Sequence, residues 1–119
     1  DINNQCVLDS LVKIAPVYVV RGNNDREWAE QLPHDLTVQI EGWKIFMVHN
    51  RKEIENLPED ADIVIFGHSH KYFEQVIDGR LWLKPGSCGK RRFGQEISLA
   101  VLTVDGKDYQ VRKIVLPME

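Results

Sequence analysis

The sequence contains few cysteines, no long hydrophobic run and no excess of positive charge. Its two cysteines, Cys6 and Cys88, are far apart, and we favour free thiols in a reducing compartment over a disulfide between them. No apolar run approaches the roughly 20 residues of a membrane helix, and no signal-peptide pattern opens the chain. A net charge of −3 gives no electrostatic reason to expect a nucleic acid or an anionic membrane as a partner. The composition therefore predicts a cytoplasmic protein that binds neither.

The length and composition are those of one ordinary globular domain. A chain of 119 residues, 43% hydrophobic and 28% charged, can bury one core but not two, so we assign residues 1–119 to a single domain. The sequence has no internal repeat, low-complexity tract or linker. It begins at Asp1 rather than at a methionine, which we interpret as the mark of a processed, truncated or partly observed protein.

Hydrophobic periodicity predicts a mixed α/β protein. Apolar residues at helical spacing predict a helix over 6–13, and β-branched or apolar runs predict buried strands at 17–20 and 62–66. Short helices are expected at 27–32 and 51–57, each ending before a proline. Pairs of strands flank Glu41-Gly42, Asp78-Gly79 and Asp105-Gly106, which are hairpin signals. Because so many strands would make a large single sheet, we expect two mixed β-sheets flanked by helices.

Three of the apolar runs end in asparagine or histidine. They read "VYVVRGNND", "KIFMVHN" and "IVIFGHSH". In open α/β sheets the loops at the carboxyl ends of the strands diverge around a crevice, and ligands bind there. We therefore expect Asn23, His49, His68 and His70 to converge in space although they are far apart in sequence.

Each of these residues also has an ordinary structural interpretation. An isolated histidine such as His49 is more often a hydrogen-bonded structural residue than a ligand. Asn23 and Asn24 follow a glycine and suit a turn, because asparagine tolerates positive φ. Taken alone, the Gly-His-Ser-His run fits a metal site and a structural role about equally well. His34 follows a proline in a loop with no partner suggested, so we assign it no function.

The joint pattern is far more specific than its parts. The blocks "GNND", "VHN", "GHSH" and "KPGS", in this order and each at the end of a strand, resemble the calcineurin-like metallophosphoesterase superfamily, and most closely its small YfcE-type phosphodiesterases. The resemblance runs over essentially the whole chain. It implies the α/β/β/α sandwich of that family. A strand, a helix and a second strand of the family pattern are missing ahead of Asp1, so we expect this chain to be the C-terminal portion of a complete enzyme.

The resemblance also implies a set of metal ligands. Asp1 takes the position of the aspartate that bridges two metals, and Asn23, His49 and His68 complete the ligands of one ion. The other ion would be bound by Asp1 and His70. Its remaining ligands belong to an Asp-x-His block that this sequence does not contain, so this chain alone is expected to be inactive or slow.

The chemistry implied by this ligand set is phosphoester hydrolysis. Mixed nitrogen and oxygen ligands suit manganese, our first choice, or zinc, iron or nickel, better than calcium. Two such divalent ions would clamp the attacking and leaving oxygens, and a metal-bound hydroxide would attack the phosphorus. The expected substrate is a small phosphodiester.

Several residues outside the ligand set depart from the family pattern or could contact the substrate. Asn24 stands where many family members have a histidine that protonates the leaving group; it can bind a phosphate oxygen but cannot supply a proton, so we expect a preference for good leaving groups. Arg51 could bind a substrate phosphate or could simply begin a solvated helix. Lys84 replaces the asparagine usual before Pro-Gly-Ser in the family. The basic run 90–92 fits a solvated loop better than a substrate contact.

Two other functions compete with the enzyme. The same fold serves as a non-catalytic protein-interaction scaffold in the retromer subunit that resembles this family, although several ligand histidines are replaced there and are kept here. A structural zinc domain would need closely spaced cysteines, which this sequence lacks. The exposed hairpin expected over 97–115 could also pair between subunits and form a homo-oligomer.

Overall fold

The computed structural model describes residues 2, 4–22, 25, 29–88 and 96–117. Asp1, Asn23, Asn24 and the basic run 90–92 therefore lie outside the described residues. The described chain has one α-helix, one 3-10 helix and seven strands: α1 (Gln5–Val12), β1 (Asp35–Ile40), β2 (Trp43–Val48), η2 (Arg51–Glu53), β3 (Ile63–Ile65), β4 (Tyr72–Ile77), β5 (Arg80–Pro85), β6 (Ile97–Val104) and β7 (Tyr109–Leu116).

The strands form two sheets, as predicted. Strands β1 to β5 make a mixed sheet in the order β1-β2-β3-β5-β4, and β6 pairs with β7 in a second, antiparallel sheet. The three central strands β2, β3 and β5 are parallel, while β1 and β4 pair antiparallel at the two edges. The carboxyl ends of β2, β3 and β5 consequently lie at the same edge of the sheet.

Two of the three predicted hairpins have the expected two-residue turns. Glu41 and Gly42 have φ of 52° and 82°, and Asp78 and Gly79 have φ of 52° and 75°, as a type I′ turn requires. The connection between β6 and β7 is longer, because Val104 pairs with Tyr109 and leaves four residues in the loop, 105–108. The Asp105 carboxylate accepts hydrogen bonds from two backbone N–H groups of this loop and so stabilises the wider turn.

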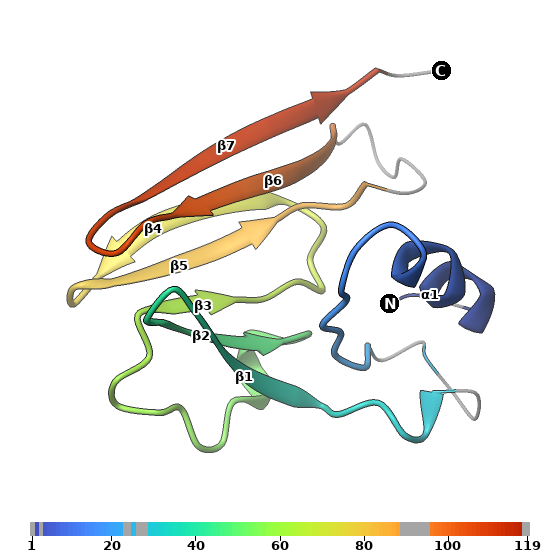
Figure 1. The fold of residues 1–119 in the computed structure, drawn as a ribbon, viewed down its shortest axis with the longest axis horizontal. Helices are drawn as coiled ribbons and strands as arrows, with labels where there is room; N and C mark the ends of the chain where they lie inside the picture. Colours follow the sequence, from blue (N-terminus) through green and yellow to red (C-terminus); the bar gives the residue numbers. More distant parts are fainter. Residues whose placement is uncertain (1, 3, 23–24, 26–28, 89–95, 118–119) are drawn as a thin grey trace.

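The core lies on both faces of the five-stranded sheet. On one face Ile45, Ile63, Leu81 and Leu83 are buried under the β6–β7 sheet, whose partly buried residues include Leu102. Figure 1 shows this pair of strands stacked over the larger sheet. The opposite face buries a second cluster, which consists of Phe46, Val48, Ala61, Val64 and Phe66. Side chains alternate along each parallel strand, so each strand contributes residues to the core on both faces, as expected for strands buried on both faces.

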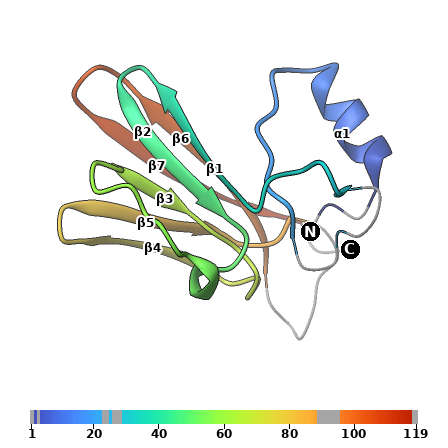
Figure 2. The same ribbon diagram turned by 90° about the horizontal axis from the view of Figure 1, so that it is seen from below.

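The segment before β1 lies beyond the end of the sheet. Helix α1 is capped by Asn4, whose side chain accepts a hydrogen bond from the Cys6 N–H. The predicted helix is confirmed, but its apolar face is mostly uncovered: Leu8 is buried, whereas Leu11 and Val12 are 44% and 62% exposed. Both views place α1 beside the strand ends rather than over a sheet face (Figure 1, Figure 2).

Two predicted elements are wrong in the described structure. Residues 17–20 form no strand, since they share no β-ladder with another described segment, and Tyr18 is 59% exposed. A strand needs a hydrogen-bonded neighbour as well as β-branched residues. The helix predicted over 51–57 is only the single turn of η2, because Ile54 turns to an extended conformation, with ψ of 115°. After this turn the chain is irregular, and Ile54 and Leu57 pack against the buried cluster that contains Phe46.

No helix in the described ranges is long and apolar enough to cross a membrane. Both cysteines, Cys6 and Cys88, are free thiols on the surface, as predicted.

Candidate functional site

Parallel pairing of β2 with β3 brings two of the predicted ligands together. The ladder ends with Met47 opposite Ile65, and the backbone contact continues two residues further, where the Gly67 N–H donates to the His49 carbonyl at 2.8 Å. A Cβ at position 67 would lie 3.5 Å from that oxygen, which is an ordinary van der Waals contact. His49 and His68, 19 residues apart in sequence, therefore leave the sheet side by side.

The two imidazoles face each other through ring nitrogens. His68 Nδ1 lies 3.3 Å from His49 Nε2, and the ring centroids are 5.2 Å apart at an interplanar angle of 80°. Two nitrogens bound to one ion at about 2.05 Å and at a tetrahedral angle are about 3.3 Å apart. The separation of these nitrogens therefore fits two ligands of one divalent ion.

The protonation of His49 also suits a ligand. Burial and, to a smaller extent, the neighbouring charge of His68 lower the pKa of His49 from 6.5 to about 4. His49 is therefore neutral at pH 7, and the neutral imidazole is the form that binds a metal.

The shifted pKa of His49 predicts a pH-dependent stability. Because the folded-state pKa of about 4 lies below the ordinary 6.5, the unfolded chain binds more protons between these values. We expect the free energy of unfolding to fall as the pH falls from 6.5 to 4, and His49→Gln to remove that part of the slope. Urea unfolding in EDTA across this range measures the slope. The exposed control His34→Gln should keep it, and equal slopes for wild type and His49→Gln would contradict the prediction.

The loop after β3 has an unusual backbone conformation. His68 and His70 have φ of 79° and 64°, a left-handed region in which histidine is several-fold enriched but still uncommon. Such conformations persist where the surrounding structure holds them, and they cluster at functional sites. With this conformation both histidines lie in a loop and not on a strand, where residues two apart would project from the same face.

Of the other predicted ligands, only His70 lies within the described residues. Asp1, Asn23 and Asn24 lie outside the described residues. Within the ranges that the structure describes, no group of three histidine, cysteine or carboxylate side chains is placed to hold a metal. His70 is half-buried two residues beyond His68, and its role as a ligand stays a prediction.

Sequence reasoning missed Asp25, the last residue of the "GNND" block. Asp25 is only 2% exposed, and its carboxylate accepts hydrogen bonds from the Ile2 N–H at 2.8 Å and from the Gly22 N–H at 2.9 Å. Arg21 donates through Nε to the Asp25 carbonyl at 2.9 Å. The Asp25 carboxylate thus links Gly22 to Ile2 near the start of the chain. The signal in the sequence that could have indicated a role for Asp25 is its place at the end of the "GNND" block.

Replacing Asp25 with asparagine tests this role. One carboxylate oxygen becomes an NH₂ group that cannot accept from a backbone N–H, and a buried donor loses its partner. We expect Asp25→Asn to lower the free energy of unfolding by about 1.5 kcal/mol. The matched control is Asp105→Asn, because the Asp105 carboxylate also accepts from two backbone N–H groups but lies in an exposed turn. Equal losses for the two variants would contradict the role given to Asp25.

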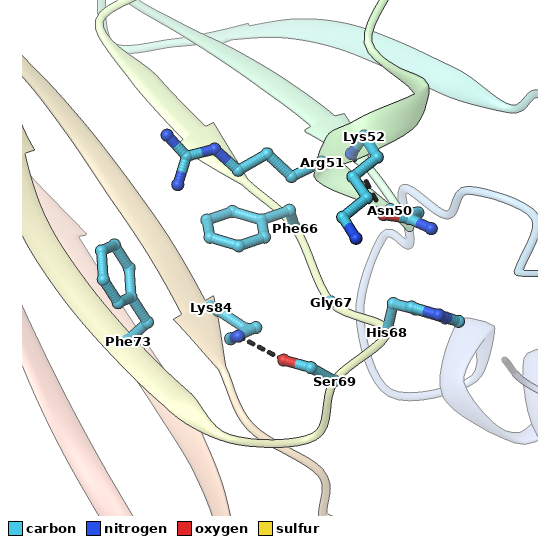
Figure 3. Close-up of a pocket in the computed structure, with 9 residues that line it drawn as sticks. All are labelled: Asn50, Arg51, Lys52, Phe66, Gly67, His68, Ser69, Phe73 and Lys84. Carbon is cyan, nitrogen blue, oxygen red and sulfur yellow. Dashed lines mark hydrogen bonds between the residues drawn. The ribbon is translucent and has the colours of Figure 1, made fainter.

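A pocket of about 390 Å³ adjoins His68. It lies over the ends of β3 and β5 and is lined by Asn50, Arg51, Lys52, Phe66, Gly67, His68, Ser69, Phe73 and Lys84. Figure 3 shows Arg51, Phe66 and Lys84 on one side of Gly67, with His68 extending away from Phe73.

Cations and aromatic rings share this pocket. The Arg51 guanidinium lies 4.4 Å from the centre of the Trp82 ring, and Lys84 Nζ lies 5.5 Å from the centre of Phe66. Lys84 also donates a hydrogen bond to the Ser69 hydroxyl. Burial lowers the pKa of Lys84, and the positive charges of Lys71 and Arg51 lower it further. Arg51 is therefore held against aromatic rings; whether it binds substrate stays a prediction.

Hydrogen bonds from Ser98 hold the turn after β5 against the second sheet. Gly86 has φ of 89°, and the Ser98 hydroxyl from β6 donates to the Pro85 carbonyl at 2.9 Å. Ser98 is 1% exposed and its N–H donates to the Ser87 carbonyl at 3.0 Å. The "KPGS" block thus anchors the end of β5 to the second sheet.

Comparison with known proteins identifies the family. The model of the calcineurin-like phosphoesterase superfamily domain matches residues 1–107. A probable metallophosphoesterase of Methanothermobacter thermautotrophicus is 29% identical over 116 residues, which cover 90% of this chain and 67% of that protein. Phosphodiesterase MJ0936 of Methanocaldococcus jannaschii is 27% identical, with 86% of this chain and 69% of that protein covered.

Solved structures share the fold. Vps29 from Entamoeba histolytica, in complex with zinc, has a TM-score of 0.71 at 21% identity, and the match covers 93% of this chain and 76% of that one. The chain spans about two thirds of the length of the two archaeal relatives, whose matched shares are 67% and 69%. The family match extends over most of the sequence, and the chain belongs to the calcineurin-like phosphoesterase superfamily.

Proposed function

We propose that this protein hydrolyses phosphodiesters with two divalent metal ions held at the carboxyl ends of its parallel strands. The observation that carries the proposal is the pair His49 and His68, whose ring nitrogens lie 3.3 Å apart at these strand ends in a phosphoesterase-family chain. The names of the archaeal relatives, a metallophosphoesterase and a phosphodiesterase, support the reaction class.

The proposed ligands divide between two ions. Asp1, Asn23, His49 and His68 would hold one ion, and Asp1 and His70 the other. When bound, the ions would supply an ionised water near neutral pH and would offset negative charge at the phosphate. The nitrogen and oxygen donors favour manganese, with zinc, iron or nickel as alternatives.

In the proposed reaction a water oxygen bonds to phosphorus and the bond from phosphorus to one ester oxygen breaks. The departing oxygen then takes up a proton or leaves as an anion. Asn24 can donate a hydrogen bond to a phosphate oxygen, but an amide gives up no proton at neutral pH. We therefore propose a preference for aryl diesters, whose leaving groups need no proton donor, over alkyl monoesters.

The test is hydrolysis of bis(4-nitrophenyl) phosphate by the protein as its gene encodes it. We expect turnover with manganese, loss of turnover in EDTA, recovery on adding the metal back, and much slower release of phosphate from an alkyl monoester. Absence of turnover with manganese, zinc, iron and nickel would overturn the proposal. Equally fast turnover of the alkyl monoester would overturn the role given to Asn24.

A second function is a non-catalytic protein-interaction scaffold. The observation that favours it is the likeness to Vps29, a vacuolar protein sorting protein, over 93% of this chain. The same assay separates the two functions, because a scaffold would remain inert with every divalent ion while keeping its fold.

The proposed partners follow from the proposed reaction. We propose a small phosphodiester as the substrate, with no nucleic acid or membrane involved. A cytoplasmic location agrees with the two free surface thiols, Cys6 and Cys88. The β6–β7 sheet has only two strands among the described residues, and its free edges could pair two copies of the chain.

A further inference from the structure

The pocket beside His68 contains positively charged side chains that have no carboxylate partner in the described part of the chain. Arg51, Lys52 and Lys84 line it, and within the described part of the chain neither Arg51 nor Lys84 forms an ion pair with a carboxylate. Two lysines at other sites, Lys44 and Lys113, do have carboxylate partners. Arg51 and Lys84 are therefore left available to an anion from outside the chain.

The position of Lys84 is costly without such an anion. Its ammonium is partly desolvated and is repelled by Lys71 and Arg51. The hydrogen bond to Ser69 could be donated equally well by a neutral amide, so it does not explain a charge at this position. A bound anion would offset both the desolvation and the repulsion.

The rest of the pocket is aromatic. Phe66 and Phe73 line it, and their ring centroids are 6.1 Å apart at an interplanar angle of 60°. Figure 3 shows the Lys84 ammonium lying between these two rings and Ser69, with the Arg51 guanidinium on the far side of Phe66. A flat apolar group could rest on the rings while an attached anion reaches the cations.

We propose that this pocket binds the non-scissile arm of the substrate, and that this arm carries an aromatic ring and a second phosphate, the chemistry of a nucleoside bisphosphate. The inference rests on the proposed function for the placement of the scissile phosphate, because His68 belongs to both the candidate metal centre and the pocket wall. The second phosphate is bound by Lys84, and Arg51 and Lys52 add positive charge from farther away. The ring lies against Phe66 and Phe73.

The catalytic test uses two matched substrates with the same leaving group. They are the 4-nitrophenyl ester of thymidine 5′-phosphate and the same ester with an added 3′-phosphate. In the wild type with manganese we expect kcat/KM to be about tenfold or more higher for the second ester, since hydrogen bonds to charged groups contribute about 1.5–3 kcal/mol. Lys84→Gln should reduce this ratio to near one, and Arg51→Gln should lower it.

A binding test does not depend on catalysis. Calorimetry in EDTA compares adenosine 3′,5′-bisphosphate with adenosine 5′-monophosphate. We expect the bisphosphate to bind about tenfold or more tightly, and Lys84→Gln to remove the difference. The control Lys107→Gln removes one exposed positive charge from the β6–β7 turn and should leave the difference intact. Thermal unfolding of each variant establishes that it is folded.

The outcomes separate this inference from the proposed function. If both esters are hydrolysed with equal kcat/KM, the pocket proposal is overturned while the phosphodiesterase stands. If the bisphosphate binds through Lys84 but neither ester is hydrolysed, the pocket stands as an anion site and the enzyme fails. If Lys107→Gln and Lys84→Gln have equal effects, the preference is a matter of net charge and the pocket proposal is overturned.

Discussion

Replacing His68 with asparagine should lower kcat/KM for an aryl phosphodiester by about 100-fold or more, because removing a group that merely supports a metal ligand already costs about 10–100-fold. Asparagine is chosen because it tolerates the positive φ of 79° at this position, so the loop can keep its shape while the imidazole is lost. Hydrolysis of bis(4-nitrophenyl) phosphate with saturating manganese is the measurement.

The control for this variant is His34→Asn. His34 is exposed in the loop before β1, and nothing in the sequence or in the site gives it a role. We expect its kcat/KM and metal content to equal those of the wild type. If His68→Asn keeps the wild-type rate and binds the same amount of metal, the His49–His68 pair is a structural hydrogen bond and the proposed centre is wrong.

Gly86→Ala should lower the free energy of unfolding by about 3 kcal/mol, the largest stability effect expected here. A Cβ at position 86 would lie 2.2 Å from the Ser98 hydroxyl oxygen, which is buried and hydrogen-bonded to the Pro85 carbonyl. Relieving the clash must break that hydrogen bond or move the turn. The φ of 89° adds strain for any residue with a side chain.

Two other glycines make a graded control series, measured by urea unfolding. Gly79 also has a positive φ, 75°, but nothing lies within 4 Å of an added Cβ, so Gly79→Ala should cost about 1 kcal/mol from backbone strain alone. Gly106 has neither feature, and Gly106→Ala should be close to neutral. Equal losses at positions 79 and 86 would contradict the packing argument, since backbone strain would then account for both.

Local chemistry explains which parts of the fold were predictable. The turns at Glu41-Gly42 and Asp78-Gly79 depend on backbone conformations that few residues adopt, so the sequence alone indicates them. Likewise the run 62–66 contains the buried strand β3, because its short length, its β-branched residues and the glycine that follows it are typical of a buried strand. Residues 17–20 have similar composition but no partner strand among the described residues, and composition carries no information about a neighbour.

The candidate site was predictable as a set of strand ends but not as a set of contacts. The contact between His49 and His68 follows from the parallel register of β2 and β3, which a single sequence does not specify. Asp25 and Lys84 were within quoted blocks, yet their roles depend on burial and on neighbours from distant segments. The Ser98 contact to the "KPGS" turn joins two sheets and could not be read from either segment alone.

The most direct test of the account is a zinc titration followed by ¹⁵N resonances of the histidine rings. The account predicts that His49 Nε2 and His68 Nδ1 shift together, with one dissociation constant, while His34 does not move. The atoms are those that lie 3.3 Å apart. If the two resonances stay unchanged, or shift with different dissociation constants, these histidines do not share an ion, and the metal centre at the ends of β2 and β3 does not exist as described.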